Sequence, residues 1–166
     1  MLADILSRIW EAVSQAPPWV VVPPDEAGVI VRLGRVRRVV TGGCFWKIPF
    51  VERVRTICIA EDSSDLPNQT IESADGRRVS VSGYIRYHVV DARKAILAVR
   101  DYDTLLPRQA MKEIAGAISG CKTLRLAEIE SAVEDTLEEH AARWGLSIDE
   151  FGLTDLSSSL VVRIIQ

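Results

Sequence analysis

The stretch that decides the fold is residues 66–90, LPNQTIESADGRRVSVSGYIRYHVV. Its two halves are typical of strands, over Leu66–Glu72 and Arg78–Val90, and the Asp75-Gly76 pair between them is a strong hairpin signal. The second strand alternates strictly. Its apolar face carries Val79, Val81, Ile85, Tyr87 and Val89, and its polar face carries Ser80, Ser82, Tyr84, Arg86 and His88. This pattern predicts an antiparallel hairpin with one buried face.

Beyond residue 90 the hydrophobic period changes from that of strands to that of helices. Capping and stop signals set the expected bounds, with Asp91 as an N-cap, Pro107 in a first turn, and Gly120 and Gly145 as stops. Three helices are predicted: over Ala92–Arg100, from Asp103 or Thr104 to Gly120, and around Leu126–Trp144. Two strands follow, at Leu146–Phe151 and Leu160–Ile165, with Ser157-Ser158-Ser159 between them as a polar turn. Strands first, helices second and a returning strand predict an α+β fold built on an antiparallel sheet.

Upstream of the hairpin, Leu2–Val13 has the spacing of an amphipathic helix, and two proline pairs after it force an extended linker or edge strand at Trp19–Val22. A further hairpin is predicted at Leu33-Gly34-Arg35. We therefore expect four segments: an N-terminal amphipathic helix (1–16), a Pro-rich extended linker (17–24), a main domain (25–156), and a C-terminal segment (157–166) that is either a strand or an interaction segment.

Composition excludes several classes of protein. The chain has 166 residues, a net charge of −3, and three cysteines without metal or disulfide spacing, which we expect to be small core residues. No apolar run reaches the roughly 20 residues of a membrane-spanning helix, and no basic region precedes the apolar start, so neither a transmembrane segment nor a signal peptide is expected. We expect a cytoplasmic protein, or one attached peripherally to a membrane.

Charge is segregated along the chain. Seven bases and one acid lie between residues 27 and 55, whereas nine acids and one base lie between residues 127 and 155. Such a chain can dock head to tail on a copy of itself or turn its basic end to anionic lipid. The alternative is that both segments are solvated faces. The candidate subunit–subunit charges are Arg35, Arg37, Arg38, Glu134, Glu138 and Glu139.

Two apolar groups are candidates for contact with a membrane or a partner protein. The N-terminal helix offers Leu2, Ile5, Leu6, Ile9 and Trp10, which could lie on lipid as a membrane foot or pack into a partner groove. A second contact is offered by Phe45, Trp46, Ile48 and Phe50, with Trp46 and Phe50 as its leading candidates, although at least two of the four are expected in the core.

The residues of an active site are not apparent. The two histidines, His88 and His140, have no partners at metal-ligand spacing, and the glycines form neither a dinucleotide nor a phosphate-loop motif. The basic segment lacks interleaved aromatics at Arg32–Arg38 that would stack on bases, so no nucleic acid partner is expected. We predict no catalytic residue, no metal and no cofactor.

Four blocks, in order, resemble the SPFH or band 7 domain of stomatins, prohibitins and flotillins. They are Pro24–Val36, Gly43 with Trp46–Phe50, Asp65–Thr70 with Ser73–Gly76 leading into Val79-Ser80-Val81, and Tyr87 through Asp101-Tyr102. The resemblance runs from about Val22 to Gly120, and Trp144–Asp155 is similar to the family's closing strand.

The resemblance implies a non-enzymatic scaffold that assembles side by side, as a homo-oligomer, on a membrane surface. Family members usually carry a hydrophobic anchor and a long coiled coil. The short amphipathic start and the lack of sustained heptads instead suggest a minimal version of the domain. The alternative is an accessory or capping module that docks on a larger protein assembly through its N-terminal helix.

Overall fold

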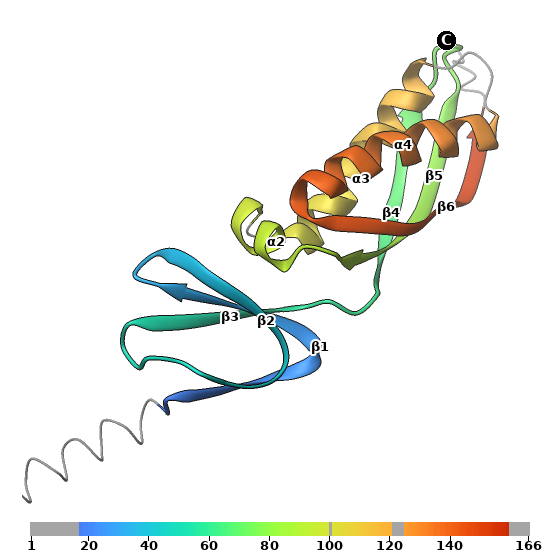
Figure 1. The fold of residues 1–166 in the computed structure, drawn as a ribbon. Helices are drawn as coiled ribbons and strands as arrows, with labels where there is room; N and C mark the ends of the chain where they lie inside the picture. The colour runs from blue at the N-terminus through green and yellow to red at the C-terminus, as the bar shows by residue number, and fades with distance from the viewer. Residues whose placement is uncertain (1–16, 100, 121–124, 160–166) are drawn as a thin grey trace, which may run out of the picture. The chain divides into compact units, whose positions relative to one another are not determined.

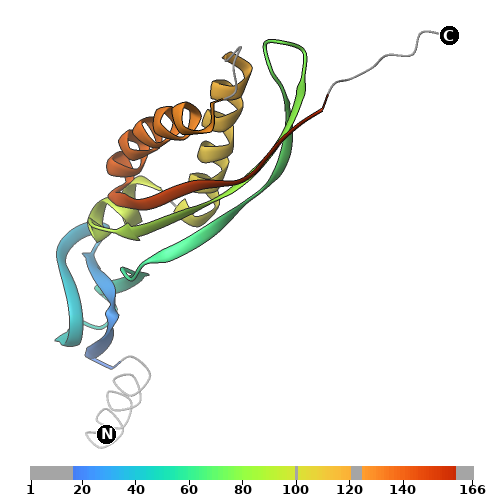
Figure 2. The same cartoon turned by 90° about the vertical axis from the view of Figure 1, so that its right-hand side faces the viewer.

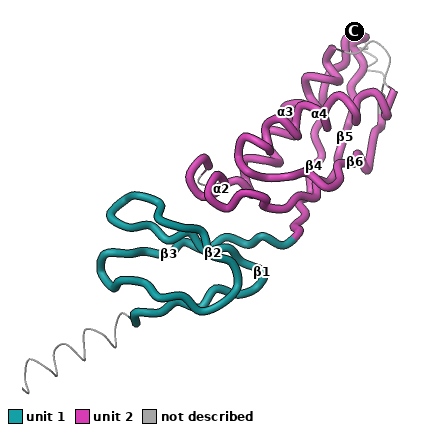
Figure 3. Tube along the Cα trace, in the orientation of Figure 1, with its two compact units in different colours: residues 1–60 teal, residues 61–166 magenta. Residues whose placement is uncertain are grey.

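The computed structural model describes residues 17–99, 101–120 and 125–159. The chain divides into two compact units, unit 1 up to Ala60 and unit 2 from Glu61 (Figure 3). Each unit has its own three-stranded antiparallel sheet, and the helices among the described residues belong to unit 2 (Figure 1). The predicted N-terminal helix, with Leu2, Ile5, Leu6, Ile9 and Trp10, lies outside the described residues, as does the predicted strand at Leu160–Ile165.

Unit 1 consists of β1 (Trp19–Arg32), β2 (Arg35–Trp46) and β3 (Glu52–Cys58), in the order β2-β1-β3. The predicted hairpin is confirmed, because Arg32 pairs with Arg35 across a two-residue turn. Both turn residues have positive φ, 47° at Leu33 and 82° at Gly34, which is the pattern of a type I′ turn. A small core of Val22, Ile30 and Val40, with Phe45 and Val54 packed against it, holds the sheet together.

The proline-rich start of β1 is a strand. Trp19–Val22 pairs with the end of β2, and a register shift between Val22 and Ala27 accommodates Pro23 and Pro24, which cannot donate to a ladder. Beyond the shift, β1 is central and pairs with both neighbours.

Unit 2 places β5 (Arg78–Val89) between β4 (Asp62–Glu72) and β6 (Leu146–Ser159). The helices α2 (Ala92–Ala98), α3 (Tyr102–Gly120) and α4 (Leu126–Trp144) lie on one face of this sheet (Figures 1 and 2). The predicted alternation of β5 is confirmed, since its apolar side chains are buried, as are Leu106, Ile114 and Ile118 of α3. The buried faces of β5 and α3 thus both contribute to the interior of unit 2.

The polar face of β5 points away from the helices, and its side chains are bonded to the neighbouring strands. Ser80 donates to Asn68 at 2.6 Å, and Tyr84 donates to Glu150 at 2.5 Å. The remaining pairs are Ser82 with Thr154, Arg86 with Glu150, and His88 with Asp149.

Local signals predicted the start of α2 and the end of α4 correctly, whereas α2 ends at Ala98 instead of Arg100. The carboxylate of Asp91 accepts from the N–H of Lys94 at 3.0 Å, as an N-cap does. Gly145 ends α4 at a φ of 77°, and its N–H reaches the carbonyls of Ala141 and Ala142. Pro107 lies in the second turn of α3 instead of the first, because the helix begins at Tyr102.

Two further expectations about the strands are corrected. The single antiparallel sheet is in fact two sheets, since β3 pairs with β1 and β4 pairs with β5. Alternation indicates which face of a strand is buried, not which strand is its neighbour. The returning strand is continuous over Leu146–Ser159, so Ser157 does not turn but pairs with Ser80.

The cysteines also differ from expectation. Cys44 and Cys58 are exposed, not core residues, and Cys121 lies outside the described residues. In each strand the neighbouring residue takes the inward position: Phe45 packs on the core beside Cys44, and Ile57 is buried beside Cys58.

Candidate functional site: an apolar rim and an arginine hollow in unit 1

Large apolar side chains are exposed along the turns of unit 1. We call these five residues the apolar rim: Trp19 (52% exposed), Leu33 (82%), Trp46 (71%), Ile48 (42%) and Phe50 (82%). Trp19 and Trp46 are register partners at the ends of β1 and β2, and their rings meet edge to face with centroids 6.5 Å apart. Exposed apolar residues that lie close together typically mark a contact surface.

The loop 47–51 connects the two ends of the rim. The N–H of Lys47 donates to the carbonyl of Pro18 at 2.7 Å, which ties the loop to the start of β1. At the other end the N–H of Leu33 donates to the carbonyl of Val51 at 3.3 Å. The hairpin tip and the residue after Phe50 are therefore joined by a backbone hydrogen bond.

Leu33 and Phe50 are held in a backbone conformation that non-glycine residues rarely adopt. Their φ angles are 47° and 66°, and both side chains are 82% exposed. The left-handed region costs an L-residue about 1–2 kcal/mol, and neither side chain recovers that cost by packing in the core. Strain of this kind points to a functional role for a side chain.

A buried carboxylate holds the loop in place. Glu52 accepts from the N–H of Ile48 at 2.9 Å and from a guanidinium nitrogen of Arg37 at 2.5 Å. The Ile48 N–H and then Arg37 lower the pKa of the Glu52 carboxyl from its usual value of 4.5, and the charge of Arg32 lowers it further. Glu52 thus stays ionised and fixes both the loop and Arg37.

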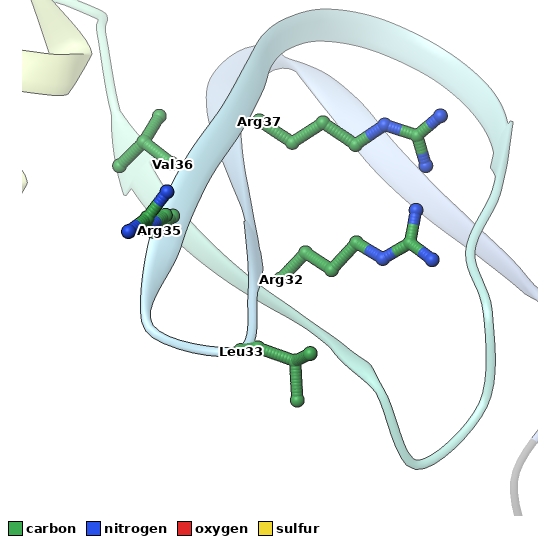
Figure 4. A pocket seen from close by; sticks show the side chains of 5 residues that line it. All are labelled: Arg32, Leu33, Arg35, Val36 and Arg37. Atoms are coloured by element: carbon green, nitrogen blue, oxygen red, sulfur yellow. The ribbon is translucent and has the colours of Figure 1, made fainter.

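The hairpin beside the rim borders a hollow of about 470 Å³. Its lining residues, which we call the arginine hollow, are Arg32, Leu33, Arg35, Val36 and Arg37. Figure 4 shows the side chains of Arg32 and Arg37 extending alongside each other, with Leu33 at the hairpin tip and Arg35 leaving the ribbon in another direction. Among the described residues, Arg32 and Arg35 have no side-chain acceptor.

The four candidate apolar residues at positions 45–50 agree only in part with the expectation that at least two of them lie in the core. Trp46, Ile48 and Phe50 are exposed, whereas Phe45 is half-buried against the core of unit 1. Core placement therefore holds for one of the four residues, not two. The contact role of Trp46 and Phe50 stays a prediction.

The candidate charged residues lie in different units. Arg35, Arg37 and Arg38 are exposed on β2, where Arg38 lies 5.9 Å from the Phe45 ring and donates to the carbonyl of Trp46. On α4, Glu138 and Glu139 are exposed and Glu134 is half-buried, and Glu139 is paired with Arg143.

Sequence reasoning missed three residues that the structure brings to this region: Trp19, Leu33 and Glu52. Leu33 carries a signal in retrospect, because it precedes glycine in a two-residue turn where asparagine is the common residue. Glu52 is the single acid in the basic segment, which is a weaker hint of an internal counter-ion.

The described ranges contain no group of three or more His, Cys, Asp or Glu side chains arranged to hold a metal ion. Within these ranges, too, the helices are too short or too polar to cross a bilayer. His88 forms a pair with Asp149 at 2.8 Å on the polar face of the unit 2 sheet, and His140 lies near Gln109 at 3.3 Å.

Comparison with known proteins places these features in context. An uncharacterised protein of Methanothermobacter thermautotrophicus is 32% identical over 129 residues, covering 75% of this chain and 41% of that protein. Another, from Methanocaldococcus jannaschii, is 29% identical over 141 residues, covering 82% of this chain and 71% of that protein. Human stomatin-like protein 2, mitochondrial, is 26% identical over 140 residues, covering 81% and 39% respectively.

This chain thus spans about two fifths of the length of two of these relatives. Residues 20–164 match the SPFH domain / Band 7 family, which covers both sheets and the three helices. Members of that family are generally non-enzymatic, membrane-associated scaffolds. The resemblance seen in the sequence is therefore confirmed, and the chain belongs to the SPFH/Band 7 family.

Proposed function

We propose that this protein is a non-enzymatic scaffold module that assembles side by side with copies of itself on a membrane surface, with the apolar rim of unit 1 in contact with lipid. The observation that carries the proposal is the rim itself: five large apolar side chains, two of them in strained backbone positions, face solvent beside arginines. Tryptophans and arginines together are typical of surfaces that meet a bilayer interface.

A single copy would bind lipid weakly. Full burial is worth about 1.5–3 kcal/mol for each rim side chain, so five give at most roughly 7–15 kcal/mol. Association costs about 4–15 kcal/mol in lost freedom of motion, which offsets most of that gain. Many copies held in one assembly would bind the membrane far more tightly. Once one copy has bound, the other copies of the same assembly are held close to the lipid surface. Self-assembly is therefore the step on which membrane attachment depends.

Charge supplies a route to self-assembly. The β2 arginines Arg35 and Arg38 are exposed, and so is Glu138 on α4. Glu139 contributes less to a neighbour, because Arg143 already pairs with it. Attraction between exposed charges is screened within about 10 Å at 0.1 M salt. We therefore expect association that strengthens as the salt concentration falls.

Vesicle flotation tests the lipid contact. The double variant Trp46→Ser/Phe50→Ser should bind phosphatidylcholine–phosphatidylglycerol vesicles at least about tenfold more weakly than the wild type. Val90→Ser/Leu97→Gln is the matched control, because it removes two exposed apolar side chains from unit 2. Equal loss in both variants, or no binding by the wild type, would refute the role of the rim.

Sedimentation tests the assembly. At low salt the wild type should form oligomers that Glu134→Gln/Glu138→Gln weakens, whereas Glu61→Gln/Glu72→Gln, with the same loss of charge, should leave them intact. A monomer at every salt and protein concentration would refute self-assembly. If such a monomer bound an assembly of a longer relative, the accessory or capping role would replace the proposal.

A further inference from the structure

We propose that the arginine hollow binds the headgroup of a phospholipid that ends in a phosphate monoester, as phosphatidic acid does, with Leu33 entering the apolar layer beside it. The inference rests on the proposed membrane contact and adds a ligand class to it. The hollow combines three guanidinium groups, an exposed apolar tip and open space in one hairpin.

Within the described residues, the charge at the hollow is not balanced. There, Glu52 is the one carboxylate bonded to this group, and it already accepts from Arg37 and from the N–H of Ile48. Three guanidinium groups and one carboxylate leave a net charge of +2. Arg32 and Arg35 keep their donors available, since within the described residues no side-chain acceptor meets them.

The geometry suits a phosphate better than a carboxylate or a halide. A guanidinium presents a planar fork of N–H donors that matches two phosphate oxygens at once. A phosphate monoester carries close to two negative charges near neutral pH and three terminal oxygens, so its charge matches the net charge of the hollow and its oxygens can accept from the arginines that line it. A phosphate diester carries one charge and two free oxygens, and would leave part of this donor set unpaired.

The apolar tip favours a lipid over a free phosphate. Leu33 lines the same hollow as the arginines, is 82% exposed and has a φ of 47°. A soluble phosphate would leave this strained, exposed leucine without a contact. A lipid headgroup places acyl chains next to its phosphate, where the leucine side chain is removed from water.

Vesicles of matched surface charge test the headgroup preference. The wild type should bind vesicles containing phosphatidic acid about tenfold more tightly than vesicles containing phosphatidylglycerol, the effect of one additional charge-assisted hydrogen bond. Arg32→Gln/Arg35→Gln should lose this preference. Arg53→Gln/Arg55→Gln is the matched control, since it removes the same charge from β3 outside the hollow. This variant should bind both types of vesicle more weakly but keep the preference for phosphatidic acid.

Equal binding to the two vesicle types, or loss of the preference in the β3 control as well, would overturn the inference while leaving the proposed membrane contact in place. Arg37 is not a test position, because its removal would leave the buried carboxylate of Glu52 without its cation.

A second measurement is independent of membrane binding. Short-chain phosphatidic acid, kept below its micelle concentration, should quench or shift the tryptophan fluorescence, to which Trp19 and Trp46 contribute, and this change should saturate in the wild type but not in Arg32→Gln/Arg35→Gln. Short-chain phosphatidylglycerol should bind about tenfold more weakly. Saturation by inorganic phosphate at the same concentration as short-chain phosphatidic acid would overturn the lipid assignment. Failure of every vesicle to bind, with saturable binding of the short-chain lipid, would overturn the membrane contact alone.

Discussion

Replacing Leu33 by asparagine should make the protein more stable and at the same time weaken its contact with lipid. The residue stands at the first central position of a type I′ turn, with a φ of 47°, and Gly34 follows at 82°. Asn-Gly is the pair that this turn favours, because asparagine tolerates positive φ. The substitution therefore relieves backbone strain and removes an apolar side chain in one step.

The two effects can be estimated from exposure and backbone angle. Leu33 is 82% exposed, so the folded protein loses at most about 0.5 kcal/mol of side-chain burial. Relief of a strain of about 1–2 kcal/mol leaves a net gain of about 0.5–1.5 kcal/mol. For a chain of this length, that gain raises Tm by about 1–6 °C. Lipid binding should fall by about fivefold to thirtyfold, since about 1–2 kcal/mol of apolar burial on the membrane is lost.

Thermal unfolding followed by circular dichroism measures the first effect, and vesicle flotation measures the second. Leu97→Gln serves as the control, because it removes an exposed leucine from α2 in unit 2 and should leave vesicle binding unchanged. A lower Tm for Leu33→Asn would refute the assignment of strain at this turn. A higher Tm with unchanged flotation would show that the tip of the hairpin does not meet lipid.

Two further predictions concern stability. Glu52→Gln should destabilise unit 1 near neutral pH. The carboxyl pKa is lowered by folding, so its contribution is present above about pH 4.5 and is lost as the pH falls through the folded-state value. Urea unfolding of both proteins should show their difference shrinking below about pH 4.5, and a constant difference would contradict this linkage. Gly152→Ala should cost about 1–3 kcal/mol, because a Cβ there would lie 2.9 Å from the Tyr84 ring. Gly116→Ala has open space and should be neutral or stabilising by contrast, so equal urea midpoints for the two would count against the packing at Tyr84.

Elements with local signals could be predicted from the sequence. Asp75-Gly76, Asp91 and Gly145 each determine the conformation of a few neighbouring residues, and each was found where its local chemistry required it. The division into two sheets could not be predicted, because strand partners are chosen by contacts distant in sequence. Ser157 was misread for a related reason: a run of serines has no apolar alternation, yet its backbone pairs with Ser80.

The site could be predicted only in part. Trp46 and Phe50 were identified as contact candidates. Their exposure, however, depended on Phe45 taking the inward position, which the amino-acid sequence alone does not show. The role of Glu52 depended on Arg37, 15 residues away, and on a backbone N–H in the loop. Acidic side chains are rarely buried, so the sequence does not predict the burial of Glu52. Only its pairing with Arg37 in the structure reveals it.

The polar face of the unit 2 sheet has a consequence for crowded surroundings. An exposed apolar sheet face promotes aggregation, whereas on this face Ser80, Ser82, Tyr84, Arg86 and His88 are polar and all bonded to side chains of adjacent strands. An approaching molecule would have to break those bonds before it formed any of its own. As far as the described residues of unit 2 are concerned, this face can thus stay exposed at high protein concentration without promoting association, so specific contacts with other molecules would form elsewhere on the surface.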